Sequence, residues 1–90
     1  MPSWYVYILV SLVKRYIYVG STNDLQRRLN EHNSGLVQST KSYRPLKIAA
    51  YIAVESERHA RELEKYFKTG SGKAILKKRF LTDEVPHRGT

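Results

Sequence analysis

The segments Trp4-Tyr-Val-Tyr-Ile-Leu-Val10 and Tyr16-Ile-Tyr-Val-Gly20 contain only aromatic and aliphatic side chains before the closing glycine. β-Branched and aromatic residues at this density predict two strands, and we expect the first to be buried on both faces. Residues 11–15 form a short polar-flanked join, which predicts that the strands pair as an antiparallel hairpin. The second strand is expected to stop at Gly20.

A helical pattern follows this hairpin. Asn23 with Gln26 resembles a capping box that starts the first helix, and Gly35 is a suitable residue to end it. Residues 34–45 are polar and predict a loop, while residues 46–54 are rich in Ile, Val, Ala and Tyr and predict a third strand.

Two more helices complete the pattern. Ser56 can cap a helix that places Ala60, Leu63 and Phe67 on one face. Gly70-Ser71-Gly72 predicts a break, after which Ser71 can cap a short helix that ends near residue 79.

This order of elements, β-β-α-β-α-α, predicts an α+β (mixed α/β) fold in which helices flank a small three-stranded antiparallel sheet. No repeat or linker interrupts the pattern, so residues 1–81 are expected to form one domain. Residues 82–90 contain proline, glycine and few apolar groups, and we expect a loose tail.

The composition points to a polyanionic partner. The 90 residues include 16 Lys and Arg against 8 Asp and Glu, a net charge of +8, which favours nucleic acid ahead of an anionic membrane.

The absence of cysteine excludes a disulfide framework, a thiol nucleophile and a cysteine-based zinc site. No apolar run approaches the roughly 20 residues that span a bilayer. Because no cationic leader begins the sequence, we expect a cytoplasmic protein.

The predicted hairpin holds four of the seven tyrosines, Tyr5, Tyr7, Tyr16 and Tyr18. The two-residue period places each strand's pair on one face. Buried phenols need hydrogen-bond partners. These hydroxyls therefore either have a chemical role or lie at the rim of an ordinary core.

Two polar features lie on helices. Arg28 and His32 are four residues apart, so they share a helix face at the edge of the core, with Arg27 on the opposite side. A cation beside an imidazole can bind and protonate phosphate oxygens, although an ordinary helix margin has the same pattern. Glu64 lies on the face that the second helix must bury. Its carboxylate needs either a metal or a salt bridge, for example to Arg28 or Arg61.

The ordered set Tyr5-Val-Tyr7, Tyr18-Val-Gly20, Arg28-x-x-x-His32 and Glu64 resembles the GIY-YIG nuclease family. The resemblance extends from about Trp4 to Arg79 and is closest over residues 18–33. Residues 64–74 are similar to small stand-alone bacterial members, which are related to the N-terminal nuclease module of the excision-repair incision subunit. Tyr5 replaces the first glycine of the motif. No late asparagine follows Glu64 and no histidine lies in residues 34–44, although some relatives have these residues.

The resemblance implies a divalent-metal-dependent DNA endonuclease with one Mg²⁺ or Mn²⁺ ion and a role such as DNA repair in the bacterial nucleoid. Glu64 would be the metal ligand, and Arg28 would hold the scissile phosphate. Tyr7 would take a proton from the attacking water, assisted by Tyr18 and His32, with Arg28 and His32 making the phenol more acidic. Gly20 would let the strand turn toward the helix without a Cβ in the cleft.

Basic residues outside this set could contact phosphates without reading sequence, so intrinsic specificity is expected to be weak. They are Lys14, Arg15, Lys41, Arg44, Lys47, Lys73, Lys77 and Lys78. We expect a monomer or a weak homodimer. Two alternatives stay open: a non-cleaving nucleic-acid-binding module derived from the same fold, and a structural RNA-associated protein.

Overall fold

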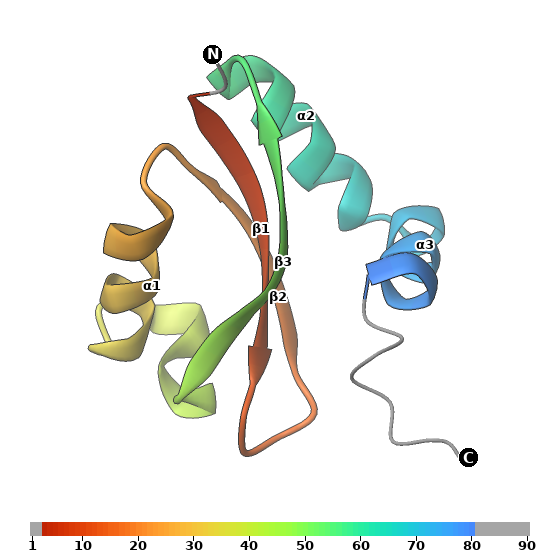
Figure 1. The fold of residues 1–90 in the computed structure, drawn as a ribbon. Coiled ribbons are helices and arrows are strands. Elements are labelled where there is room, and N and C mark those ends of the chain that lie inside the picture. The colour runs from red at the N-terminus through yellow and green to blue at the C-terminus, as the bar shows by residue number, and fades with distance from the viewer. Residues whose placement is uncertain (1–2, 81–90) are drawn as a thin grey trace.

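A computed structural model describes residues 3–80 and contains a three-stranded antiparallel sheet between helices (Figure 1). The strand order is β2-β1-β3, with β1 (Trp4–Ser11) in the centre, β2 (Ile17–Thr22) on one edge and β3 (Leu46–Val54) on the other. The predicted fold class, hairpin and third strand are confirmed. The centre of β1 is buried on both faces, as its apolar sequence predicts.

The prediction that the second strand stops at Gly20 is wrong. β2 continues to Thr22, and Gly20, Ser21 and Thr22 pair with consecutive residues of β1. Gly20 lies opposite Tyr7, and a Cβ on Gly20 would overlap the phenol ring. A glycine is therefore needed here to leave room for the Tyr7 ring, while the strand pairing continues through it.

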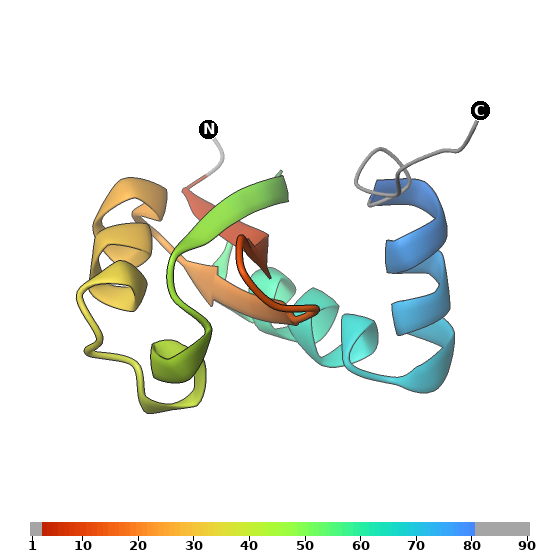
Figure 2. The same ribbon diagram turned by 90° about the horizontal axis from the view of Figure 1, so that it is seen from below.

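The helices lie on both faces of the sheet, and Figures 1 and 2 show α1 on one side with α2 and α3 on the other. α1 spans Leu25–Asn33, α2 spans Glu57–Phe67 and α3 spans Gly70–Phe80. Alternation along β1 supplies two cores: Val6 and Ile8 pack with α2 and α3, whereas Tyr7 and Leu9 pack with α1. Within residues 3–80, no helix is long and apolar enough to cross a membrane.

The start of α1 differs by one residue from the prediction. Asp24, and not Asn23, is the N-cap, because its extended backbone lets the carboxylate accept the Arg27 amide at 3.0 Å. The Asn23 side chain instead accepts a hydrogen bond from the Arg27 guanidinium. The predicted end is confirmed: Gly35 has φ +85° and follows the C-cap.

The predicted loop at residues 34–45 contains a 3₁₀ helix, η1 (Gln38–Tyr43), so that part of the prediction is wrong. Asn33 anchors the segment beside η1, because its side chain donates to the Leu46 carbonyl and accepts from the Leu46 amide. Thr40 is fully buried within η1. The short helix is polar along its sequence and therefore leaves no apolar periodicity to recognise.

The last helix starts earlier and is longer than expected. Thr69, and not Ser71, caps α3, since its hydroxyl accepts the Gly72 amide at 3.1 Å. Gly70-Ser71-Gly72 therefore forms the first turn of α3 instead of a break, and α3 is as long as α2, with 11 residues each. Gly72 is buried against the Tyr66 carbonyl, where no Cβ would fit. The predicted tail at residues 82–90 lies outside the described residues.

Candidate active site

A cleft of about 330 Å³ lies at the edge strand β2, where residues from both faces of the sheet meet. Its lining includes Tyr7, Tyr18, Gly20, Ser21, Arg28 and Glu64. The central strand, the edge strand, α1 and α2 each contribute to this set, so the cleft exists only in the folded chain. The fifth predicted residue, His32, lies directly behind Tyr7.

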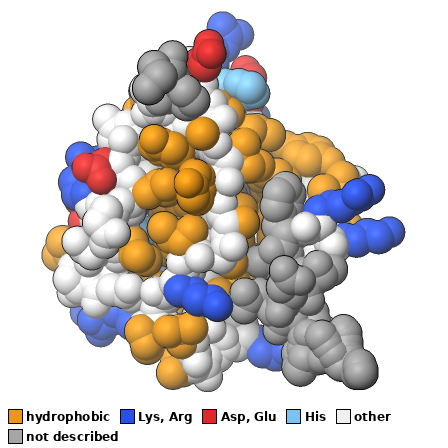
Figure 3. All heavy atoms as spheres, viewed as in Figure 1, with side chains coloured by type: hydrophobic (Ala, Val, Ile, Leu, Met, Phe, Trp, Pro, Cys, Tyr) orange, Lys and Arg blue, Asp and Glu red, His pale blue; other side chains and the backbone are white. Residues whose placement is uncertain are grey.

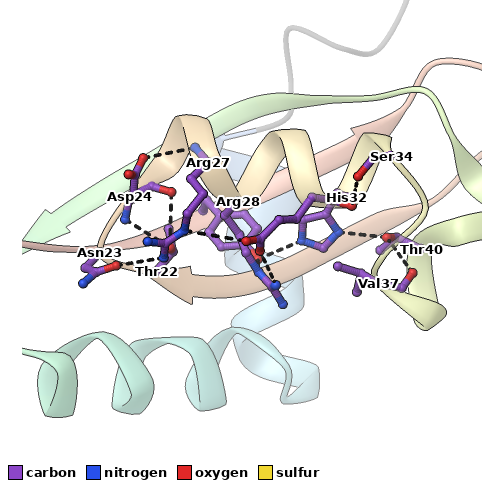
Figure 4. A network of polar contacts seen from close by, with 11 residues as sticks. Thr22, Asn23, Asp24, Arg27, Arg28, His32, Ser34, Val37 and Thr40 are labelled. Atoms are coloured by element: carbon purple, nitrogen blue, oxygen red, sulfur yellow. Dashed lines mark hydrogen bonds and ion pairs between the residues drawn. The ribbon is translucent and has the colours of Figure 1, made fainter.

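His32 is fully buried, which corrects the expectation that it emerges at the edge of the core. Its Nε2 lies 2.9 Å from the Tyr7 hydroxyl and its Nδ1 lies 2.8 Å from the Thr40 hydroxyl, as Figure 4 shows for the second contact. The ring also meets Tyr7 and Tyr18 edge-on, with centroid separations of 5.7 and 5.0 Å. Both nitrogens of the imidazole thus have a hydrogen-bond partner, and the two aromatic contacts help to hold the ring in one orientation.

Burial controls the protonation of this pair. Burial raises the pKa of Tyr7 to about 12, although the Arg28 hydrogen bond acts in the opposite direction. Burial, with a smaller contribution from the Arg28 charge, lowers the pKa of His32 to about 4. Arg28 thus acts on the phenol in the expected direction, but burial outweighs it, so Tyr7 is less acidic than a free tyrosine. At neutral pH both side chains are uncharged.

Arg28 connects the phenol to the mouth of the cleft. Its Nε lies 3.4 Å from the Tyr7 hydroxyl and its Nη1 donates to Glu31 at 2.8 Å. These contacts raise the pKa of Arg28 above its usual range, so the guanidinium is permanently charged. Its side chain is 34% exposed, which leaves it accessible to an anion in the cleft.

Glu64 enters the cleft from α2 and is only 20% exposed. Oε1 accepts the Ser21 hydroxyl at 2.7 Å, and Oε2 accepts Lys68 Nζ at 2.8 Å. Burial alone would raise the pKa of Glu64, but these two hydrogen bonds and the charges of Lys68 and Arg61 outweigh burial and lower it. The carboxylate is anionic at neutral pH, and its salt-bridge partner is Lys68.

The donor set fits one mode of metal binding. Residues 3–80 contain no cluster of three or more His, Cys, Asp or Glu that could enclose an ion. A single anionic glutamate in a water-accessible cleft instead suits Mg²⁺ or Mn²⁺ that keeps most of its water ligands and also binds a substrate phosphate.

A basic groove begins beside this cleft. It has a volume of about 1190 Å³ and lies between the β1–β2 turn and α3. Tyr18 lines both the groove and the cleft, and Lys68 of the groove donates to Glu64 of the cleft. Lys68 Nζ lies 5.7 Å from the centre of the Tyr18 ring. The walls of this basic groove carry six cations and, among the described residues that line it, no acid: Lys14, Arg15, Lys47, Lys68, Lys73 and Lys77.

Five of the eight basic residues predicted from the sequence thus line the basic groove, and Lys41, Arg44 and Lys78 do not. Arg44 instead lies against Gly35, near the end of α1. Figure 3 shows Lys and Arg side chains projecting from the side of the molecule that α3 forms.

Sequence reasoning missed three residues of the site. Lys68 could have been found, since it follows Glu64 by four residues on the same helix face. Ser21 lies in the segment that resembles the nuclease family, next to Gly20, but a lone serine carries no further signal. Thr40 had no local signal, because only the fold brings η1 to His32.

Comparison with known proteins agrees with this geometry. The model of the GIY-YIG catalytic domain matches residues 3–79. A protein of Acanthamoeba polyphaga mimivirus is 50% identical over 38% of this chain and 20% of its own length. UPF0213 proteins of Bacillus pumilus and Clostridium perfringens are 40% and 35% identical over 63% and 71% of this chain, and over 59% and 69% of their own lengths.

The first of these relatives are thus matched over less than two thirds of their length. The family match, however, covers nearly all of the described residues and includes each of the five residues singled out above. The chain belongs to the GIY-YIG catalytic domain family, a nuclease family, and to its group of small UPF0213 proteins.

Proposed function

We propose that this protein is a divalent-metal-dependent endonuclease that hydrolyses DNA phosphodiester bonds with weak sequence specificity. One observation carries the proposal: a permanent cation, an anionic carboxylate and a hydrogen-bonded phenol line the same small cleft. A binding module needs the cation to hold phosphate, but it has no need for a carboxylate whose negative charge repels phosphate.

Arg28 is the residue that we assign to the scissile phosphate. Its planar guanidinium can donate two parallel hydrogen bonds to the nonbridging oxygens, which a lysine cannot reproduce. The Glu31 contact at 2.8 Å holds the side chain toward the cleft before substrate arrives. Because the guanidinium is already oriented, little reorganisation is needed as charge builds on the phosphate.

Tyr7 is the residue that we assign to proton transfer from the attacking water. A phenol with a pKa of about 12 cannot act as a preformed phenolate at neutral pH. Its neighbour Nε2 of His32, at 2.9 Å, allows a relay instead. The water loses a proton to the Tyr7 oxygen while the proton of the Tyr7 hydroxyl passes to Nε2, so neither phenolate nor free hydroxide has to accumulate.

Glu64 would hold the Mg²⁺ or Mn²⁺ ion, with Ser21 keeping the carboxylate oriented through the 2.7 Å hydrogen bond. When bound, the ion supplies positive charge for the leaving 3′ oxygen. Lys68 occupies the other carboxylate oxygen at 2.8 Å, so it must yield that oxygen or share it when metal binds.

The basic groove is the surface that we assign to the DNA backbone leading away from the cleft. Its cations would contact phosphates, while the apolar residues between them offer no base-edge donors or acceptors. This division agrees with weak sequence specificity.

The test is cleavage of single-stranded, duplex and branched DNA with and without Mg²⁺ or Mn²⁺. Glu64→Gln keeps the shape and removes the charge, and we expect cleavage to fall by more than about 100-fold. Glu62→Gln, on an exposed part of the same helix, is the matched control and should cleave like the parent. Salt-dependent binding without product under either metal would instead support the non-cleaving module.

A further inference from the structure

Thr40 is a fully buried polar residue that lines neither the cleft nor the basic groove. Its hydroxyl lies 2.8 Å from Nδ1 of His32 (Figure 4). The Tyr7 hydroxyl lies at the other ring nitrogen, Nε2. A buried hydroxyl requires hydrogen-bond partners, and the imidazole provides one of them.

The donors around the ring select one tautomer. Arg28 Nε donates toward the Tyr7 oxygen, so this oxygen is already an acceptor. The best acceptor for the proton of the Tyr7 hydroxyl is then Nε2 of His32. Thr40 in turn can donate to the Val37 carbonyl at 3.4 Å, which leaves its oxygen as an acceptor for a proton on Nδ1. The hydrogen bonds then run in one direction. Arg28 donates to Tyr7 and Tyr7 donates to Nε2; on the other side of the ring Nδ1 donates to Thr40, which donates to the Val37 carbonyl.

The opposite tautomer satisfies fewer groups. With the proton on Nε2, the Tyr7 oxygen would face two N–H donors, and its own proton would have to leave the network. Thr40 would have to donate to Nδ1 and give up the Val37 carbonyl.

We infer that Thr40 is a positioning residue of this active site: its hydroxyl accepts the Nδ1 proton of His32 and so keeps Nε2 able to receive the proton of Tyr7. The inference rests on the proposed function for its catalytic meaning, but the tautomer itself is a property of the resting protein. In the other tautomer, Nε2 already carries a proton and the relay from Tyr7 is blocked.

The fold holds Thr40 in place through η1. The Tyr16 ring of the hairpin stacks on Tyr43 with centroids 3.7 Å apart, and the Tyr16 hydroxyl donates to the Ser39 carbonyl at 3.2 Å. These contacts fix the short helix against the sheet at both sides of Thr40. The Thr40 hydroxyl is therefore anchored to the strands that carry Tyr7 and Tyr18.

The tautomer can be read directly by long-range ¹H–¹⁵N correlation spectra of the ¹⁵N-labelled full chain at neutral pH, without metal or DNA. The His32 signals are assigned by their loss in His32→Gln, and His59, exposed on α2, is the internal reference. We expect a protonated Nδ1 and an unprotonated Nε2 in the parent and in Thr40→Ser. In Thr40→Val we expect a mixture, or a proton on Nε2.

Cleavage supplies the second measurement. Thr40→Val should slow cleavage by about 10- to 100-fold with substrate affinity unchanged, and Thr40→Ser should restore most of the rate. A parent with the proton on Nε2 overturns the inference without any variant, and so does a Thr40→Val protein that cleaves like the parent. If the parent cleaves no DNA, the nuclease proposal fails, and the spectra still decide whether Thr40 sets the His32 ring.

Discussion

Gly20 lies directly opposite Tyr7 in the β1–β2 ladder, and a Cβ on Gly20 would lie 2.5 Å from the Tyr7 hydroxyl oxygen. It would also lie 3.0 Å from the Tyr18 ring. Both rings therefore occupy space that only glycine leaves open. The glycine of this motif thus sets the position of the phenol that the proposed mechanism uses.

Gly20→Ala should consequently move Tyr7 out of its hydrogen bond with His32. We expect a loss of about 1–3 kcal/mol in the free energy of unfolding, since overpacking a core forces side chains to shift. The cleavage rate should fall by more than the loss of folded protein accounts for, because the Tyr7 oxygen is displaced from the cleft. Chemical denaturation and cleavage rates are the measurements.

Gly70→Ala is the matched control for this change. Gly70 is exposed and is the first residue of α3. Apart from its chain neighbours and the backbone of its own helix, no described atom lies within 4 Å of a Cβ placed at Gly70. Its unfolding free energy should change by less than about 0.5 kcal/mol, and its cleavage rate should be unaffected. Equal effects of the two substitutions would contradict the crowding argument.

The ion pair between Glu64 and Lys68 leads to a prediction about metal affinity. Lys68 occupies one oxygen of the only carboxylate assigned to the metal, so it competes with the ion. Lys68→Met should tighten Mn²⁺ binding at pH 7 by roughly 2- to 5-fold, the modest size expected for a half-exposed pair. Titration followed by electron paramagnetic resonance measures the affinity.

Lys65→Met, on the exposed side of the same helix, should leave Mn²⁺ affinity unchanged. Weaker metal binding in Lys68→Met would mean that Lys68 supports the carboxylate instead of competing with the ion. Removal of Lys68 should also raise the pKa of Glu64, because its hydrogen bond is the largest contribution that lowers it.

The uncharged state of His32 predicts a pH dependence of stability. Its pKa is about 4 in the folded protein and 6.5 in a model peptide, so the unfolded chain binds the extra proton between these values. By linkage, the free energy of unfolding then falls as pH drops from about 6.5 to 4, by up to about 3 kcal/mol.

Denaturation as a function of pH checks this sign. His32→Gln removes the titrating group, so its stability should fall less between pH 6.5 and 4 than that of the parent. His59→Gln, at an exposed histidine, should keep the slope of the parent. An identical slope in all three proteins would show that folding does not lower the pKa of His32.

The strands and the cleft differ in how far the sequence predicts them. The apolar hairpin and residues 46–54 carry a strong local signal, and all three strands that they predict are present. The resemblance to the GIY-YIG family singles out one set of residues, Tyr7, Tyr18, Arg28 and Glu64. Only Glu64, a carboxylate on a buried helix face, also stands out from its local pattern alone. The structure places all four in one cleft.

Other features depend on contacts that no local pattern encodes. Thr40 reaches His32 only because η1 packs against the β1–β2 hairpin, where Tyr43 stacks on Tyr16 just before β2. The pKa of Tyr7 depends on burial, which outweighs the Arg28 cation beside it. The N-caps of α1 and α3 were predicted one and two residues away from their positions in the structure. Neighbouring polar residues can each serve as a cap, and the backbone angle selects between them.

The basic groove gives the last prediction, which concerns DNA binding without cleavage. Lys77 lines the groove, whereas its neighbour Lys78 on α3 is exposed elsewhere. If groove cations contact phosphates, Lys77→Gln should weaken binding at every sequence tested and reduce the slope of log affinity against log salt by about 1. Lys78→Gln should keep both the affinity and the slope of the parent. Fluorescence anisotropy of labelled DNA in metal-free buffer over a range of salt concentrations separates the two. Equal losses in both variants would assign binding to the diffuse positive charge of the protein and not to the groove.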